Sequence, residues 1–302
     1  MLTFKQLTHA LAVERTLHFK KAANHCAVSQ SALSASIHEL ESQLGSPLFE
    51  RNNKHVMLTS FGRVFLQRAR QVVLAAEDLM AFAQAQREPL SYPLSIGVIP
   101  TIGPFLLPKV LPHVREAYPN VSLRLVEEQS HRLVQQVRDG ELDTAIVALP
   151  YPLEGLHAFE FWDENFFVVM HHSEVDTDAT RIRADELAVE RLLLLREGHC
   201  LKDHALSACR LQMSAKQDTS LESTSLYTLV QMVAGKMGLT LVPELALEQL
   251  VTSESGLVAL ALAEPGPHRS LAFITRLNYV GVDGVERLRV CFREALMNAP
   301  AH

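Results

Sequence analysis

Two cysteines nine residues apart, Cys200 and Cys209, are the side chains of this sequence best suited to redox chemistry. We expect a short helix from Leu201 to Cys209. Nine residues of helix rise roughly 13 Å and turn through about 900°, so the two thiols point to opposite faces. A disulfide needs Cα atoms within roughly 7 Å of each other. The two thiols can therefore bond only if the segment unwinds, and such a pair would be a switch.

Cys200 has the surroundings of a reactive thiol. It stands at the start of the expected helix, where backbone N–H groups favour a thiolate, and His199 and Lys202 add positive potential. A thiolate attacks a peroxide to give a sulfenic acid, which a second thiol captures as a disulfide, and Cys209 is the obvious second thiol. The alternative is that both are small buried hydrophobic residues, the common state of free cysteine. That alternative is our interpretation of the remaining two cysteines, Cys26 and Cys291.

The composition is that of a soluble globular protein, with 48% hydrophobic and 21% charged residues among 302. The first residues lack the basic stub and apolar core of a signal peptide, and no apolar run reaches the length of a membrane span. We therefore expect a cytoplasmic protein with reduced thiols and no membrane contact. The adjacent His171 and His172 would face opposite sides of a strand, and no four-ligand set has metal spacing. Neither a metal site nor a cofactor is expected.

Charge is distributed unevenly along the chain. The first 70 residues contain nine lysines and arginines against four acidic residues, whereas the rest contains 19 against 30. A basic end on an acidic body indicates contact with a polyanion such as nucleic acid. On charge alone, chance clustering on a solvated surface explains the bias equally well.

The basic end has the pattern of a helix-turn-helix. Apolar residues at helical spacing predict a helix over residues 3–13, a second begins at Phe19, and a third follows the N-cap Ser29. A two-stranded wing is expected up to residue 59. The expected buried face of the third helix consists of Ala32, Leu33, Ile37 and Leu40. The expected contacts to DNA bases or phosphates come from Ser29, Gln30, Ser31, Ala32, Ser34, His38, Arg51 and Lys54. The alternative is a small helical interaction domain whose polar helix faces solvent.

A long helix is expected next, because residues 60–88 contain no proline and only one glycine. A heptad seam with one basic interruption runs along it through Phe61, Phe65, Arg68, Val72, Ala75, Leu79 and Phe82. Such a seam favours pairing with a second copy, which would present two helix-turn-helix units to two half-sites. The alternative is a helix packed on its own domain. We place a DNA-binding domain at 1–59, a linker and dimerisation helix at 60–90, and an effector domain at 91–302.

The rest of the chain alternates strands and helices. Strands are predicted at 94–99, 121–127, 142–149, 166–170, 192–195, 239–242 and 271–275, and helices at 105–117, 131–138, 201–209, 225–234 and 285–296. This alternation predicts mainly parallel sheets with helices on both faces, in two sets of similar length. We therefore expect an α/β fold of two lobes, with any ligand in the cleft at the carboxyl ends of the strands.

Roughly the first 65 residues resemble the winged helix-turn-helix domain of LysR-type transcriptional regulators. The resemblance is carried by Phe19, Ala22, Ala23, Val28, Ser29, Gln30, Ala32, Leu33, Ser34, Ile37, Leu40, Leu44, Gly45, Leu48, Phe49, Arg51, Leu58, Thr59 and Gly62. Ser31 stands where the family usually has proline, which is only favoured at a first helical turn. The remainder is similar, less specifically, to LysR effector domains, which resemble periplasmic binding proteins. The resemblance implies an activator whose partners are double-stranded DNA, further copies in a dimer or tetramer, and RNA polymerase.

The cysteine segment resembles the peroxide-sensing OxyR subgroup of the LysR family. The likeness lies in residues 192–209, 99–104 and 224–226, and a departure at 170–174 falls on a surface turn. The resemblance implies Cys200 as the peroxidatic cysteine and Cys209 as its resolving partner. It also implies a peroxide pocket, in which a helix-start hydroxyl holds the peroxide. The implied pocket members are Thr101, which supplies that hydroxyl, His199, Ser130, Asp203 and Arg269.

These patterns together predict a DNA-binding regulator, not an enzyme, that senses hydrogen peroxide through Cys200 and controls oxidative-stress genes. Oxidation would unwind residues 200–209 and repack the interface between the lobes. It would thereby change the distance between the two helix-turn-helix units of a dimer. One alternative keeps the DNA binding but places a small metabolite in the inter-lobe cleft, with structural cysteines. Another is an enzyme such as a thiol peroxidase, for which nothing in residues 1–60 is suited.

Overall fold

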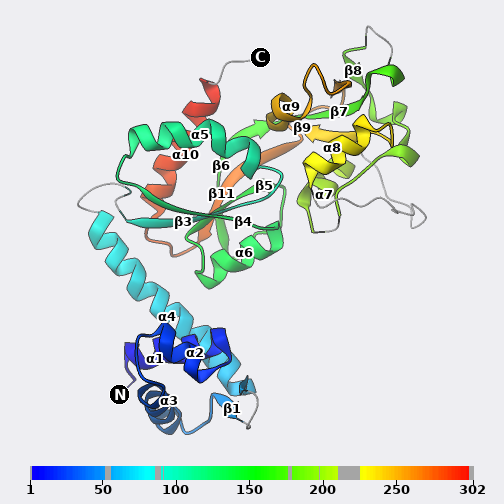
Figure 1. The fold of residues 1–302 in the computed structure, drawn as a ribbon. Coiled ribbons are helices and arrows are strands. Elements are labelled where there is room, and N and C mark those ends of the chain that lie inside the picture. The colour runs from blue at the N-terminus through cyan, green and yellow to red at the C-terminus, as the bar shows by residue number, and fades with distance from the viewer. Residues whose placement is uncertain are drawn as a thin grey trace. The chain divides into compact units, whose positions relative to one another are not determined.

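The computed structural model of the chain describes residues 2–51, 56–85, 90, 92–175, 179–196, 198–209 and 225–298. The chain divides into two compact units, Met1–Ala83 and Gln84–His302, which are described in turn (Figure 1). None of the helices in the described ranges combines the length and the apolar character that crossing a membrane requires.

The first unit contains three short helices, a wing and most of a long helix. Its elements are α1 (Phe4–Thr16), α2 (Phe19–His25), α3 (Gln30–Leu44), the antiparallel strands β1 (Phe49–Arg51) and β2 (Val56–Leu58), and α4 (Ser60–Ala85). Ser29 caps α3, since its hydroxyl accepts the N–H of Ala32 at 3.2 Å. Gly45 ends α3 with φ 68°, a conformation that glycine adopts without strain. The predicted helix order and wing are therefore present.

One face of α3 packs into the core of this unit. Leu33, Ile37 and Leu40 are completely buried, at the spacing of a single helix face. The expectation that Ala32 belongs to the same face is wrong, because Ala32 lies one position off the stripe and is exposed. The small side chain of Ala32 is therefore accessible on the surface of α3.

α4 is apolar on two sides. On one side, Val73 is buried against Leu7 of α1. Much of the predicted seam lies on the other side, where Phe61 is 43%, Val72 55% and Leu79 66% exposed. Phe65 is the exception, because it is half-buried against the core of its own unit. The helix thus packs on its own unit with one face and leaves a second apolar face uncovered within the described chain.

The first lobe of the second unit is built on a five-stranded sheet of order β4-β3-β5-β11-β6. Its strands are β3 (Pro93–Val98), β4 (Ser122–Glu127), β5 (Thr144–Leu149), β6 (Leu156–Glu164) and β11 (Arg269–Arg276). Its helices are α5 (Gly103–Ala117), α6 (Ser130–Asp139) and α10 (Val282–Met297). α5 packs against α10, whereas α6 contacts β5 and β11 (Figure 1). α5 and α6 lie on opposite faces because right-handed crossovers that run in opposite directions put their helices on opposite sides.

The second lobe is built on a four-stranded sheet of order β8-β10-β7-β9. Its strands are β7 (Phe166–His171), β8 (Arg181–Ile182), β9 (Thr240–Pro243) and β10 (Leu257–Leu262). Its helices are α7 (Cys200–Ala208), α8 (Leu226–Ala234) and α9 (Glu244–Leu250), with short 3-10 turns at His172–Glu174, Ala184–Glu186 and Val189–Arg191. The predicted α/β architecture of two lobes is confirmed.

The expectation of mainly parallel sheets is wrong. β3 is parallel to β4 and β5, but β11 is antiparallel to β5 and β6, and β7 is antiparallel to β9 and β10. β11 returns from the second lobe, a long-range path that a strand–helix–strand pattern does not reveal. The strand expected at 192–195 is reduced to one bridge between Leu192 and Leu239. The sequence pattern also misses β10, α9 and β6. β6 is an edge strand in which polar residues interrupt the apolar ones, so it has no long apolar run.

The described chain crosses between the two sheets at two adjacent places. β6 ends at Glu164 and β7 begins at Phe166, while β10 ends at Leu262 and β11 begins at Arg269. Arg269 and Glu164 are direct partners in the antiparallel register of β11 and β6. Two segments far apart in sequence therefore meet where the lobes join.

Truncation of a core leucine tests this packing. Leu94 of β3 is completely buried, so Leu94→Ala should lower the free energy of unfolding by about 2–5 kcal/mol, through lost burial and the cavity left behind. Leu277→Ala is the control, since Leu277 is 59% exposed and its truncation should change stability by less than about 0.5 kcal/mol. Urea unfolding can be followed by the fluorescence of Trp162, the sole tryptophan, in β6 of the same sheet. Equal effects of the two substitutions would contradict the assigned core.

Candidate functional site

Cys200 and Cys209 lie at opposite ends of α7. Cys200 is the first residue of the helix, and Cys209 ends it while still donating its N–H to the carbonyl of Ala205 at 3.1 Å. Both thiols are free and buried, each with 4% exposure. The intact helix separates them by roughly 13 Å along its axis, beyond the reach of a disulfide. The folded chain therefore keeps the two thiols apart.

Burial raises the pKa of the Cys200 thiol, and this effect exceeds the lowering by the Ser130 hydroxyl and by the charge of Arg269. The helix start, His199 and Lys202 are expected to favour a thiolate, whereas the burial of the sulfur acts in the opposite direction. Loss of water around the sulfur outweighs the favourable position at the helix N-terminus. Cys200 is a buried thiol whose anion depends on Ser130 and Arg269.

Buried polar atoms near Cys200 lack hydrogen-bond partners in the described chain. They are the hydroxyl oxygens of Thr101 and Ser130, the terminal nitrogen Nη1 of Arg269 and, one turn along α7 from Cys200, Nδ1 of His204. Ser130 is close enough to the sulfur to lower the pKa of Cys200, although its hydroxyl forms no hydrogen bond of good geometry. Arg269 Nη2 donates to the carbonyl of Thr101 at 3.4 Å, which connects these groups. Because buried polar groups are almost always paired in native proteins, this set indicates the place of a small polar ligand.

Two helix starts are neighbours at this site, that of α6 at Ser130 and that of α7 at Cys200. The Nε2 atom of Gln129, which precedes Ser130, lies 3.3 Å from Nε2 of His199. A Cβ at Gly198, where φ is 95°, would lie 2.9 Å from the Gln129 amide oxygen, so this close approach requires glycine. The sequence does not single out Gln129 as a site residue. Its only signal is its position immediately before the start of a helix.

The predicted pocket residues divide into a buried group and an exposed one. Thr101, Ser130 and Arg269 are each 2% exposed, and His199 is also buried. Burial lowers the pKa of the His199 imidazole, which is therefore neutral at physiological pH. Asp203 is exposed, and its charge raises the pKa of Cys200. The structure thus brings four of the five predicted residues into the buried site and leaves Asp203 outside it.

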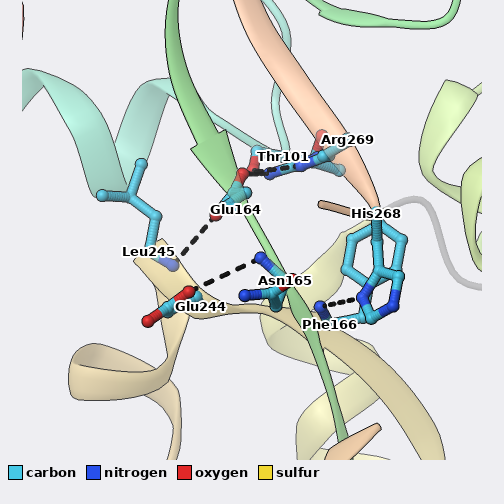
Figure 2. Close-up of polar contacts among 8 residues, drawn as sticks. All are labelled: Thr101, Glu164, Asn165, Phe166, Glu244, Leu245, His268 and Arg269. Carbon is cyan, nitrogen blue, oxygen red and sulfur yellow. Dashed lines mark hydrogen bonds and ion pairs between the residues drawn. The ribbon is translucent and has the colours of Figure 1, made fainter. Parts of the chain in front are cut away.

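Arg269 is held by a buried carboxylate, that of Glu164. Glu164 Oε1 accepts the N–H of Arg269 Nε at 2.6 Å and lies 2.5 Å from Nη2, and neither side chain has exposed surface. Its second oxygen accepts the N–H of Leu245, in the first turn of α9, at 3.0 Å (Figure 2). Sequence reasoning misses Glu164 too, because it misses β6, whose last residue this is.

The crossing beside this ion pair is also fixed by its neighbours. His268 accepts the N–H of Phe166 on Nδ1 at 2.8 Å and stacks on the Phe166 ring, with centroids 5.7 Å apart (Figure 2). The Arg269 guanidinium lies 5.8 Å from the centroid of the same ring. The crossing from β6 to β7 and the crossing from β10 to β11 are therefore held together by the contacts among Phe166, His268 and Arg269.

α3 carries most of the residues predicted to contact DNA. Ser29 uses its hydroxyl to cap the helix and lies 3.0 Å from the Ser31 hydroxyl, so it is already engaged within the chain. The side chain of Arg51 and all of Lys54 lie outside the described residues. The remaining predicted contacts are the exposed Gln30, Ser31, Ala32 and His38 and the half-buried Ser34.

A winged helix-turn-helix unit joined to a two-lobed α/β unit with a buried polar site defines a DNA-binding regulator that responds to a signal. Residues 4–63 match the family model of bacterial regulatory helix-turn-helix proteins of the lysR family, and residues 87–297 match that of the LysR substrate binding domain. The chain belongs to the LysR family of transcriptional regulators.

Known relatives narrow the resemblance. The chain is 40% identical over 275 residues to the HTH-type transcriptional regulator EstR of Acinetobacter baylyi, a match that covers 91% of this chain and 90% of that protein. It is 36% identical, with the same coverage, to the hydrogen peroxide-inducible genes activator of Dickeya chrysanthemi. A full-length OxyR variant from Pseudomonas aeruginosa matches in structure with a TM-score of 0.81 and 32% identity, over 97% of this chain and 95% of that one. The predicted resemblance to OxyR-like members of the LysR family is confirmed.

Loss of the Ser130 hydroxyl should make Cys200 less reactive, because this hydroxyl lowers the pKa of the thiol. Near pH 8 the alkylation rate follows the small thiolate fraction, so Ser130→Ala should slow iodoacetamide alkylation of Cys200 by roughly fivefold to tenfold. Peptide-resolved mass spectrometry separates Cys200 from the other cysteines. Ser207→Ala, at an exposed position of the same helix, is the control and should leave the rate unchanged.

The pH dependence of this rate follows from the same shift. Because the pKa of folded Cys200 is raised, its thiolate fraction should still be growing above pH 9, beyond the ordinary thiol value of about 8.5. The alkylation rate should rise with pH over that range in the wild-type chain. A plateau below pH 8 would show that Cys200 is already an anion and would contradict the assigned environment.

Proposed function

We propose that the chain is a DNA-binding transcriptional regulator that senses hydrogen peroxide by oxidation of Cys200 and controls oxidative-stress genes. The observation that carries this proposal is the set of unpaired buried atoms near the thiol, on Thr101, Ser130 and Arg269. Hydrogen peroxide is small, uncharged and able to donate and accept hydrogen bonds, which suits such a set. The peroxide-inducible activator and the OxyR structure among the relatives support the same function.

The first step of the proposed reaction oxidises Cys200 to a sulfenic acid. The thiolate attacks one oxygen of the peroxide, the O–O bond breaks as the S–O bond forms, and the leaving hydroxide takes up a proton to become water. Ser130 and Arg269 stabilise the thiolate. The Thr101 hydroxyl and the free N–H groups on Arg269 Nη1 can donate to the oxygen on which charge develops.

The second step forms the disulfide and opens α7. The Cys209 thiol gives up its proton, its sulfur displaces the oxygen of the sulfenic acid as water, and both electrons taken by the peroxide have then come from the two thiols. Burial and, next, the charge of Glu264 raise the pKa of Cys209 to about 11, so it is protonated in the folded chain. Cys209 reaches Cys200 only when the helix between them unwinds. The disulfide and intact α7 exclude each other, which makes the oxidised state a different fold of the second lobe.

A metabolite-responsive regulator is the second candidate. EstR, at 40% identity, is described as a transcriptional regulator without reference to peroxide. The unpaired donors near Cys200 also suit a small oxygen-rich metabolite, with the cysteines as structural residues. Normal induction by a Cys200→Ser variant would favour this candidate. An enzyme is disfavoured, because residues 4–63 match a family model of regulatory helix-turn-helix proteins.

We also propose that the seam of α4 mediates homo-oligomerisation. Its exposed apolar side chains repeat at heptad spacing, as in helices that pair with a second copy. A dimer presents two α3 helices to two half-sites of double-stranded DNA. The proposed partners are therefore DNA, further copies of the chain in a dimer or tetramer, and RNA polymerase at the promoter.

Peroxide treatment tests the sensing proposal. After one equivalent of peroxide, non-reducing mass spectrometry should find Cys200 joined to Cys209, and the gel shift on DNA upstream of the chain's own gene should differ between the reduced and oxidised forms. Cys209→Ser should stop at a sulfenic acid that dimedone traps. Cys291→Ser, which removes another buried cysteine, is the matched control and should form the disulfide normally. If both thiols stay alkylatable after peroxide, the sensing proposal is wrong.

A charge placed in the α4 seam tests the oligomer. Leu79→Glu should weaken self-association by at least about tenfold, because pairing would bury the carboxylate in an apolar interface. Gln67→Glu makes the same charge change at an exposed position off the seam and should have no such effect. Light scattering over a concentration series measures both. Equal behaviour of the two variants would exclude the seam as the interface.

A further inference from the structure

Arg269, whose positive charge lowers the pKa of Cys200, already has a buried counter-charge. Glu164 pairs with its Nε and Nη2 atoms, and neither side chain has any exposed surface. Water therefore screens neither charge, and the pair is neutral as a unit. What Arg269 still offers to a ligand is the unpaired nitrogen Nη1.

Glu164 is itself held in place, so this neutralisation is a fixed feature of the fold. Its Oε2 accepts the N–H of Leu245 at 3.0 Å, and its backbone carbonyl accepts the N–H of His268 at 3.1 Å. Turning the carboxylate away would leave a buried donor and a buried guanidinium unpaired (Figure 2). A ligand anion that enters the site cannot displace Glu164 from Arg269 without that loss.

We propose that Glu164, acting through Arg269, makes the Cys200 site select uncharged oxidants and reject anionic ones. The inference rests on the proposed function, in which the oxidant approaches the Cys200 thiolate. An anionic oxidant would be repelled by the negative charge of the thiolate. Arg269 would not offset this repulsion, because its positive charge is already neutralised by Glu164. An uncharged hydroperoxide needs only the hydrogen-bonding atoms of Thr101, Ser130 and Arg269 Nη1. Glu164 is thus a positioning residue that sets charge preference without touching the reacting atoms.

Two alkylating reagents of opposite charge type measure this preference. Iodoacetamide and iodoacetate are similar in size and react alike, since the thiolate displaces iodide and forms a C–S bond, but only iodoacetate is an anion. Glu164→Gln keeps the shape of the side chain and removes its charge. The ratio of the iodoacetamide rate to the iodoacetate rate at Cys200 should therefore fall on the order of tenfold in this variant, in line with one uncompensated charge in a protein interior.

Further variants separate charge from damage to the fold. Arg269→Gln should raise the ratio, and the double variant with both glutamines, which has no unpaired buried charge, should return it close to the wild-type value. Loosened packing would speed both reagents together and leave the ratio unchanged. Cys209 in the same samples is an internal control, because it lies at the far end of α7 and its ratio should not respond to Glu164→Gln.

A peroxide series gives the second readout. The wild-type preference for hydrogen peroxide over peroxymonosulfate, an anion at neutral pH, should narrow in Glu164→Gln by a similar factor. A third measurement uses the wild-type chain alone. Sulfate is an anion, so it should not bind at the site and should not slow the alkylation of Cys200 by iodoacetamide. An unchanged reagent ratio in Glu164→Gln, or strong inhibition of the wild type by sulfate, would overturn the inference. Failure of any peroxide to oxidise Cys200 would instead overturn the proposed function, since the alkylation ratios do not depend on it.

Discussion

The buried ion pair between Arg269 and Glu164 is the interaction on which the effector unit depends. It joins the end of β6 to the start of β11, at the place where the chain crosses between the lobes. Glu164 also binds the N–H of Leu245 in the second lobe, and Arg269 binds the carbonyl of Thr101 in the first. Removing one partner of a buried pair costs about 3–5 kcal/mol, because it leaves an uncompensated charge. One pair of side chains therefore fixes the crossing, anchors the two lobes to each other and sets the charge near Cys200.

The second constraint is the hydrogen bonding of α7. As long as the helix is intact, Cys200 and Cys209 cannot bond, so the reduced fold is incompatible with the product of its own proposed oxidation. The S–S bond would have to replace the helical bonds and the burial of both thiols. Because the same helix begins beside Arg269, its opening would remove Cys200 from the groups near which it is packed in the reduced form.

The sequence predicts the features that depend on local pattern and misses those that depend on distant contacts. The helices of the DNA-binding unit follow from periodicity and caps such as Ser29, whereas Ala32 is placed on the wrong face, one position off the stripe. The direction of β11 and the existence of the edge strand β6 are set by long-range pairing, which periodicity does not contain.

The site shows the same division between local and long-range signals. Cys200 is recognisable as a candidate from its neighbours and from resemblance, but the sign of its pKa shift depends on burial, which the local sequence does not show. Gln129 and Glu164 have no local signal of function, because they matter through residues 70 and 105 positions away. The roles of the cysteines and of the pocket residues remain predictions.

The burial of Cys209 has a consequence in time. Under the proposed function, sulfenic acid formation at Cys200 requires no change of fold, whereas the disulfide waits for α7 to open locally, an event of microseconds to seconds. During that wait a cellular reductant can return Cys200 to the thiol and erase the event. The rate at which α7 opens, compared with the rate of that reduction, would then set the fraction of sulfenic acids that become disulfides. The stability of this short helix would thus set how efficiently oxidation of Cys200 is converted into a change of fold.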